Sequence, residues 1–212
     1  MPSYLEKYPS CADKREERFV YSVNSFLKQR YRDSELIIIS DGCPYTEKIY
    51  NKNFKNNNNI KFVKKERTNL FSGDSRNIGI DIADGEFVCF LDTDDFIGNK
   101  HLEILASQDL SNKDWFYYDD YLYYGNNCFR KRVTKILLDQ KNRMIIGSCS
   151  IVYKREIPIK WEDGYGHDHV LIRKLLNNYS YSKIIKAPEY FICHVPAPGK
   201  MFDIKNPYCF SV

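Results

Sequence analysis

The chain lacks three features that would place it outside the cell or in a membrane. Its seven cysteines form an odd set with no Cys-x-x-Cys pair, no signal-peptide pattern opens the sequence, and no apolar run is long enough to cross a bilayer. Cys89 and Cys149 stand inside apolar segments, where cysteine behaves as a small hydrophobic residue. Free thiols in a reducing compartment are the simplest explanation, so we expect a cytoplasmic protein. Peripheral association with the inner face of a membrane stays open.

A strong excess of charge is also lacking. The 32 basic and 28 acidic residues leave a net charge of +4, which mildly favours anionic ligands but is too small to indicate nucleic-acid binding. The composition, 43% hydrophobic and 28% charged, is ordinary for a soluble globular protein. Neither a linker nor an internal repeat divides the sequence, so we predict a single domain, residues 1–212.

Two hydrophobic patterns alternate along the first half of the chain. Apolar residues recur at helical spacing in segments 14–30, 47–55 and 74–84, and short continuous apolar runs typical of buried strands occupy 35–40, 60–63 and 86–91. This alternation predicts strand–helix–strand units and a mostly parallel sheet. In the second half we expect a hairpin in 115–124 that turns at 125–127, a strand region in 145–153 and a helix in 168–176.

Three carboxylates, Asp92, Asp94 and Asp95, directly follow the last of these predicted strands. Their charges repel one another unless a cation or a proton offsets them. Carboxylate oxygens at the carboxyl end of a strand suit Mg²⁺ or Mn²⁺, with coordination positions left for water or a substrate phosphate. The alternative is a solvated acidic turn that caps a helix at 101–106, and this stretch alone favours neither interpretation.

Three further features fall on the same edge of the predicted sheet. They are Tyr4, Asp41 and Arg76, in the segments Pro-Ser-Tyr, Ser-Asp-Gly and Asp-Ser-Arg-Asn. Taken singly, Asp41 is typical of a turn and Arg76 of a surface ion pair. Taken with the acidic stretch, they supply an aromatic ring, a carboxylate for a base or a ribose, a guanidinium for phosphate and a metal site. A nucleotide diphosphate requires these groups.

In this order the segments resemble family 2 glycosyltransferases of the GT-A fold, which are inverting enzymes that use sugar nucleotides. The matching segments are 2–4 (PSY), 25–31 (SFLKQRY), 35–43 (ELIIISDGC), 75–80 (SRNIGI), 85–87 (GEF) and 91–95 (LDTDD). Each segment is a weak signal alone, and together they are a specific one for the first half of the chain. The resemblance implies a Rossmann-like α/β fold with a nucleotide-sugar-binding half (residues 1–98) and an acceptor-binding half (residues 99–212).

The resemblance also implies roles for individual residues. Tyr4 and Asp41 would hold the nucleotide base, and Arg76 would approach the base or the phosphates. Asp92 would face the ribose and the metal, and Asp94 would be the principal Mg²⁺ or Mn²⁺ ligand of the family's Asp-x-Asp (DXD) motif. The metal would offset the charge of the departing diphosphate. The role of Asp95 stays open.

The acceptor side depends on later residues. Asp168 matches the Asp of the family's Glu-Asp pair, which is the general base, and His167 stands in place of the Glu. The ordinary alternative for Asp168 is a helix cap. His194, in the segment CHVPAPGK, would be a further metal ligand and Lys200 a phosphate contact. A structural histidine is an equal alternative for His194.

Two departures accompany the resemblance. Residues 40–43 read Ser-Asp-Gly-Cys where the family has Asp-Asp-Gly-Ser, so one carboxylate is missing. The family's first strand precedes the Pro-x-Tyr loop, and this sequence starts inside that loop. We therefore expect either translation from an upstream start or a protein that lacks a central strand, which would expose two sheet edges.

The sequence thus predicts a metal-dependent, inverting glycosyltransferase, a hexosyltransferase or a related enzyme. It would move a sugar from a nucleotide-sugar donor to a glycan, lipid-linked or protein acceptor, as in polysaccharide biosynthesis. One alternative is a catalytically inactive nucleotide-sugar-binding protein from a truncated gene. Another is a nucleotidyltransferase, which would favour a glycine-rich, basic phosphate loop near the N-terminus, and the sequence has none there.

Overall fold

A computed structural model describes residues 1–8, 11, 13–67, 71–125, 128–136, 144–186 and 188–193 of the chain. Its helices are α1 (Arg15–Leu27), α2 (Pro44–Asn53), α3 (Gly73–Asp81), α4 (His101–Ala106) and α5 (His167–Asn178), with a 3-10 turn η1 (Ser148–Ser150). Its strands are β1 (Pro2–Ser3), β2 (Leu36–Asp41), β3 (Ile60–Lys65), β4 (Phe87–Cys89), β5 (Phe96–Ile97), β6 (Trp115–Tyr118), β7 (Asp120–Gly125), β8 (Cys128–Arg132), β9 (Ile151–Lys154), β10 (Tyr181–Ile184) and β11 (Tyr190–Ile192). Among the described helices, none combines the length and the apolar character that a membrane crossing requires.

The strands form three sheets, with the orders β1-β2-β3, β10-β6-β9-β4 and β5-β11-β7-β8. The first sheet is parallel throughout, with β2 in the middle. The other two are mixed, because β4 runs antiparallel to β9 while β10 runs parallel to β6, and β11 has one neighbour of each kind. The predicted α/β class is therefore confirmed. The mostly parallel arrangement holds for the first sheet, and the boundary at residue 98 stays a prediction.

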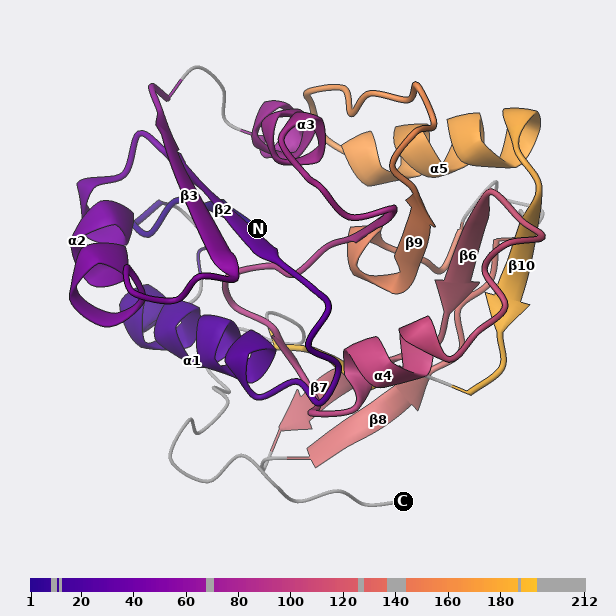
Figure 1. The fold of residues 1–212 in the computed structure, drawn as a ribbon, viewed down its shortest axis with the longest axis horizontal. Coiled ribbons are helices and arrows are strands. Elements are labelled where there is room, and N and C mark those ends of the chain that lie inside the picture. Colours follow the sequence, from indigo (N-terminus) through magenta and orange to yellow (C-terminus); the bar gives the residue numbers. More distant parts are fainter. Residues whose placement is uncertain are drawn as a thin grey trace.

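The N-terminus lies in the middle of the molecule, between β2 and β9 (Figure 1). Pro2 and Ser3, which we expected in a loop, form the short strand β1, parallel to β2. The Met1 amino group donates a hydrogen bond of 2.8 Å to the Ile37 carbonyl, and the Ile39 N–H donates one of 3.0 Å to the Met1 carbonyl. In the described ranges no strand joins β2 to β4, so the first and second sheets are separate.

Two hydrophobic clusters cover opposite sides of the strands. In the first, α1 places Phe19, Val23 and Phe26 at helical spacing against Ile38 of β2. In the second, Leu171, Ile172 and Leu175 of α5 pack with Ile80 of α3 and with aromatic residues that include Phe90 and Trp161. In Figure 1, α3 lies across β2 and β3 from α2. The helices that carry Arg76 and Asp168 therefore share one cluster.

The hairpin predicted for residues 115–124 is wrong in its first half. Residues 115–118 form β6, which pairs with β9 and β10, and the hairpin consists of β7 and β8. The break falls at Asp119, whose carboxylate accepts a hydrogen bond from the Thr134 N–H at 2.9 Å and pairs with Lys183 at 2.6 Å. Long-range partners of Asp119, not the local sequence, thus end β6.

The start of α3 packs tightly against the backbone before α5. A Cβ atom built on Gly73 would lie 2.4 Å from the Glu162 carbonyl oxygen. One turn further on, the Asn77 amide donates to the Trp161 carbonyl at 2.9 Å and accepts from the Trp161 N–H at 2.8 Å. These contacts fix the helix of Arg76 relative to the segment that leads to Asp168.

We predict opposite effects for the same substitution at two glycines of α3. Gly73→Ala will destabilise the protein by about 1–3 kcal/mol, because the added methyl group clashes with backbone that cannot move away freely. Gly79→Ala will raise the free energy of unfolding by up to about 1 kcal/mol, because its Cβ would make ordinary van der Waals contacts with the Ile39 and Ile37 side chains, at 3.7 and 4.0 Å, and alanine favours the helix. Chemical denaturation measures both, and a Gly73→Ala variant as stable as Gly79→Ala would contradict this packing.

Candidate active site

The acidic turn at the end of β4, residues 92–95, is fastened to α1. The Asp95 N–H donates to the Asp92 carbonyl at 3.2 Å, which closes the turn. The Ser22 hydroxyl donates to the same carbonyl at 3.0 Å, and the Arg18 guanidinium donates to the Asp94 carbonyl at 3.4 Å. Because these bonds use main-chain oxygens, the carboxylates of the turn stay available for other partners.

Asp95 is a structural residue of this turn. Its side chain is 1% exposed, and its two oxygens accept hydrogen bonds from the Cys193 N–H at 2.7 Å and from the Tyr190 hydroxyl at 3.1 Å. Burial and the neighbouring Asp95 carboxylate raise the pKa of Tyr190 well above its ordinary value, so the hydroxyl keeps its proton and donates. Asp95, whose role the sequence left open, thus ties the acidic turn to the end of β11.

Arg76 forms the centre of a buried polar cluster. One terminal nitrogen donates to the Asp92 carboxylate at 2.9 Å and to the Ser148 hydroxyl at 3.3 Å. The other donates to the Ser72 hydroxyl at 2.7 Å and to His167 Nε2 at 3.1 Å. The structure therefore brings together two residues that the sequence selected, Arg76 and Asp92, and pairs them directly.

The protonation state of His167 follows from this contact. Arginine has only donors, so His167 Nε2 must accept, and the ring is neutral with its proton on Nδ1. Burial, and then the positive charge of Arg76, lower the pKa of His167 below its ordinary value. The ring also makes edge contacts with Trp161 and Phe71, at centroid distances of 5.4 and 6.3 Å. His167 is thus a neutral acceptor that positions Arg76.

Asp168 lies in the first turn of α5, beside this cluster. Its Oδ1 accepts a hydrogen bond of 2.9 Å from the His169 N–H, and its Oδ2 lies 3.8 Å from the place that a Cβ on Gly147 would occupy. A carboxylate in the first turn is stabilised by the helix dipole. Ser148, next to Gly147, accepts a hydrogen bond from Arg76. The segment of Gly147 and η1 therefore lies between Asp168, the candidate base, and Arg76 of the candidate donor site.

A second group of selected residues surrounds the start of the chain. The Arg67 guanidinium lies over the Tyr4 ring, 3.4 Å from its centroid. The buried Asp41 carboxylate pairs with Lys65 at 2.7 Å, and Lys65 reaches Asp74 of α3 at 3.1 Å. Burial alone would lower the pKa of Lys65, but its hydrogen bonds with the two carboxylates raise it. This group therefore combines the Tyr4 ring, which is covered by the Arg67 guanidinium, with the Asp41 carboxylate, whose charge is paired with Lys65.

Gly42 allows the close approach on which this group depends. It has φ +64°, and a Cβ there would lie 2.7 Å from the backbone nitrogen of Arg67. The sequence did not select Lys65 or Arg67 as functional, because their partners are distant in the chain. The signal that was present is the basic character of residues 64–67, at the end of β3 and just beyond it.

Asp94 is the carboxylate best placed for a metal ion. Its side chain is half-buried and makes no hydrogen bond or ion pair with another described residue, whereas Asp92 is paired with Arg76. No group of three His, Cys, Asp or Glu side chains in the described ranges could hold a metal ion alone. Mg²⁺ is usually held by one or two carboxylates with water and substrate phosphates, so this donor set fits a metal that binds with a nucleotide diphosphate. His194 and Lys200 lie outside the described residues.

The chain is similar to several known glycosyltransferases. The family model described as Glycosyl transferase family 2 matches residues 2–179. The Escherichia coli UDP-Glc:alpha-D-GlcNAc-diphosphoundecaprenol beta-1,3-glucosyltransferase WfgD is 29% identical over 194 residues, which are 87% of this chain and 71% of that protein. The Staphylococcus aureus poly(ribitol-phosphate) beta-N-acetylglucosaminyltransferase TarS is 33% identical over 88 residues, which are 40% of this chain and 15% of that protein.

Solved structures of TarS residues 1–349 match the fold. The complex with UDP gives a TM-score of 0.71 and the complex with UDP-GlcNAc one of 0.70, each at 21% identity and over 90% of this chain. The chain spans 58% and 56% of those two chains. At this identity the likeness concerns the fold, and it confirms the expected GT-A fold.

We predict different losses of stability when Asp94 or Asp95, the two neighbouring acids of the turn, is replaced by alanine. Asp95→Ala will lower the free energy of unfolding by about 2 kcal/mol or more, because it leaves the buried Tyr190 hydroxyl and Cys193 N–H without their acceptor. Asp94→Ala will change it by no more than about 0.5 kcal/mol, because the Asp94 side chain is half-buried and carries no structural contact. Urea denaturation of the two variants measures the difference, and equal losses would contradict the separate roles.

Proposed function

We propose that this chain, which belongs to glycosyl transferase family 2, moves a sugar from a nucleotide-diphosphate donor to an acceptor hydroxyl with inversion and with the help of a divalent metal ion. The observation that carries the proposal is the acidic turn. It holds the half-buried Asp94 next to the Arg76–Asp92 pair, at the end of a strand of a GT-A fold. Asp94 would hold Mg²⁺ or Mn²⁺, which when bound offsets negative charge on the diphosphate.

The chain's own residues divide the work of binding the donor. The Tyr4 ring offers a flat apolar face for a base once the Arg67 guanidinium moves off the ring or contacts both the ring and the base. Asp41 offers an acceptor for base or ribose donors and is paired with Lys65. Arg76 is fixed by four hydrogen bonds, so its role is to orient Asp92 at the edge of the site. The UDP complexes of TarS make UDP-sugars the first donors to test.

Asp168 is the candidate general base. Its carboxylate lies in the first turn of α5, in the second half of the chain, on an element separate from the acidic turn. In the proposed step it accepts the proton of the acceptor hydroxyl as that oxygen bonds to the anomeric carbon, while the diphosphate leaves with the electron pair of the broken glycosidic bond. Attack and departure on opposite faces of the sugar give inversion. Glycan, lipid-linked and protein acceptors stay open, and a lipid-linked acceptor like that named for WfgD is the first to test.

Donor binding tests the metal role of Asp94. We expect UDP to raise the melting temperature of the protein more with Mn²⁺ than without it. A UDP concentration one hundred times its dissociation constant stabilises the folded protein by about 2.7 kcal/mol. Asp94→Asn will lose the Mn²⁺-dependent part of the rise in melting temperature, since the amide cannot supply a charged ligand. Asp81→Asn, which alters a surface ion pair with Lys160, is the control and will keep the full shift. A full Mn²⁺-dependent shift in Asp94→Asn would remove Asp94 as the ligand.

Turnover tests the role of Asp168. Asp168→Asn will bind donor and metal normally and lose transfer by a factor of about 10²–10⁴, the usual contribution of a general base. The amide oxygen can still accept the His169 N–H, so the helix start is preserved. His169→Asn is the matched control and will keep the rate. An unimpaired Asp168→Asn excludes Asp168 as base, and a wild-type protein that binds UDP-sugars but transfers to no acceptor supports the inactive binding protein instead.

A further inference from the structure

Tyr165, three residues before the candidate base, is almost completely exposed to solvent. Its side chain is 99% exposed, and it makes no hydrogen bond or ring contact with another described residue. Tyr181, a second exposed tyrosine of this half, is 40% exposed, and its ring lies 5.1 Å from that of Trp115. A tyrosine ring has a large apolar surface, which in Tyr165 is left in water. The ring is therefore available to a ligand.

A glycine on each side of Tyr165 allows the ring to change direction. Gly164 has φ +125° and Gly166 has φ +77°, and nothing lies within 4 Å of a Cβ atom built on either. The His167 N–H donates to the Gly164 carbonyl at 3.3 Å, which closes the turn. A bond of 3.2 Å from the Val170 N–H to the Gly166 carbonyl then begins α5. Tyr165 thus lies at the tip of a turn whose base is fixed, as in loops that close on a substrate.

This turn borders the polar cluster around Arg76. His167, two residues after Tyr165, contacts Arg76, and Asp168 follows in the first turn of α5. The Phe71 ring, which is 38% exposed, makes an edge contact with the His167 ring at 6.3 Å. Figure 1 shows the start of α5 beside α3, the helix of Arg76. Exposed aromatic rings therefore lie next to the cluster on the side of the candidate base.

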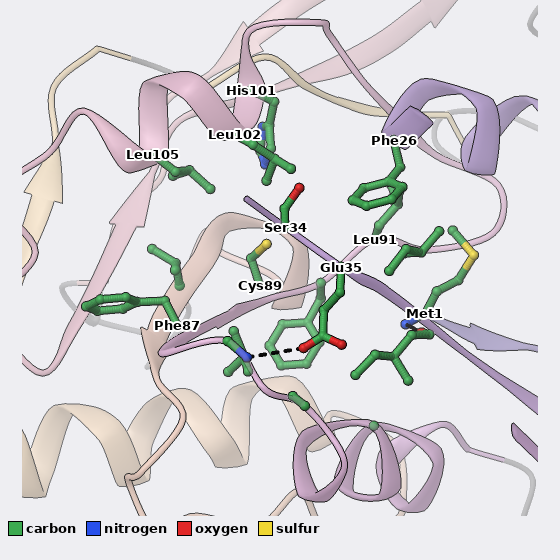
Figure 2. Close-up of a pocket in the computed structure, with 18 of the residues that line it drawn as sticks. Met1, Phe26, Ser34, Glu35, Phe87, Cys89, Leu91, His101, Leu102 and Leu105 are labelled. Atoms are coloured by element: carbon green, nitrogen blue, oxygen red, sulfur yellow. Dashed lines mark hydrogen bonds between the residues drawn. The ribbon is translucent and has the colours of Figure 1, made fainter. Parts of the chain in front are cut away.

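The cavity between β2 and β4 does not offer the acceptor a place beside that base. Its volume is about 370 Å³, and Figure 2 shows Phe26, Leu102 and Leu105 pointing into it. The hydroxyl groups of a sugar would lose their hydrogen bonds with water among these side chains. Asp168 is not one of the described residues that line the cavity, so a hydroxyl bound there would not reach it. The acceptor must therefore approach from the surface at the start of α5.

We propose that the Tyr165 ring packs on the sugar ring that carries the acceptor hydroxyl, so that Tyr165 selects a sugar as the acceptor, a role that rests on the proposed function of Asp168. One face of a pyranose presents C–H groups, which pack on the electron-rich face of an aromatic ring, while the hydroxyls at its rim stay hydrogen-bonded. Three residues span at most about 11 Å, a gap that two side chains and one pyranose fill.

The acceptor classes divide on this contact. The reacting hydroxyl lies within hydrogen-bond reach of the base, so the rest of its sugar ring lies over the turn of Tyr165. A glycan or a lipid-linked sugar presents such a ring, whereas a serine or threonine of a protein presents none. The acceptor is therefore a glycan or a lipid-linked sugar.

Ligand-observed NMR measures the contact. Methyl glycosides of glucose, galactose, mannose, N-acetylglucosamine and N-acetylgalactosamine, in both anomers, are titrated into protein with UDP and Mg²⁺. Saturation transfer to the sugar protons gives a dissociation constant for each. The unchanged chain is compared with Tyr165→Ala, Tyr165→Phe and the control Tyr181→Ala. Tyr181 follows the far end of α5, a helix of 12 residues and about 18 Å.

We expect the unchanged chain to bind at least one glycoside and Tyr165→Ala to bind it about tenfold more weakly. Tyr165→Phe, which keeps the ring, and Tyr181→Ala will bind it as the unchanged chain does. Both Tyr165 variants will keep the melting temperature and its rise with UDP, because the ring contacts no described residue.

Equal glycoside binding by Tyr165→Ala and the unchanged chain would overturn the proposal, as would an equal loss in Tyr181→Ala. Binding of UDP without binding of any glycoside would overturn it too. Melting temperatures with and without UDP, recorded on the same samples, separate this proposal from the proposed function. A chain that gives no rise with UDP contradicts the donor site, and the glycoside comparison still decides the role of Tyr165.

Discussion

The ion pair between Arg76 and Asp92 is the contact on which the rest of the candidate site depends. The Arg76 side chain is 5% exposed and that of Asp92 is 27% exposed, so the guanidinium carries most of the desolvation. A buried charge persists only when it is paired. The two terminal nitrogens of Arg76 have acceptors in Ser72 before α3, in the acidic turn, in η1 and in α5, while its Nε has none among the described residues. One side chain thus links the start of α3 and the acidic turn with η1 and the start of α5.

The acids of the turn illustrate how neighbouring residues of the same type acquire different roles. Asp95 is buried and holds the backbone, Asp92 is partly exposed and is paired with Arg76, and the Asp94 carboxylate makes no hydrogen bond or ion pair with described residues. Three unpaired carboxylates in four residues would repel one another. Because Asp92 is paired with a cation and Asp95 is held by two hydrogen bonds, Asp94 is the carboxylate whose oxygens are left for a ligand.

The sequence predicted the elements whose patterns are local. The helices expected at 14–30 and 168–176 are α1 and α5 within three residues at each end, and the strand expected at 35–40 is β2, because amphipathic spacing and a continuous Ile run each specify one structure. The pairing of the strands could not be predicted from the sequence as well as the elements themselves. The aromatic run at 115–124 contains parts of two sheets, and its division at Asp119 depends on Thr134 and Lys183.

As with the fold, the sequence predicted the local motifs of the site but not the partners that come from distant parts of the chain. Its acidic turn, Arg76 and Asp168 follow from motifs, but the partners Lys65, Arg67, Ser72 and Ser148 depend on the folded chain. The sequence also could not distinguish the roles of Asp92, Asp94 and Asp95, because burial decides between them.

We propose that Asp94 binds a metal ion together with the diphosphate of the donor. The decisive measurement is a crystal structure of the protein with UDP and Mn²⁺, recorded near the manganese absorption edge. We expect an anomalous peak about 2 Å from an Asp94 carboxylate oxygen and in contact with the diphosphate. UDP bound with its diphosphate away from Asp94, or a manganese peak at other residues, would contradict it.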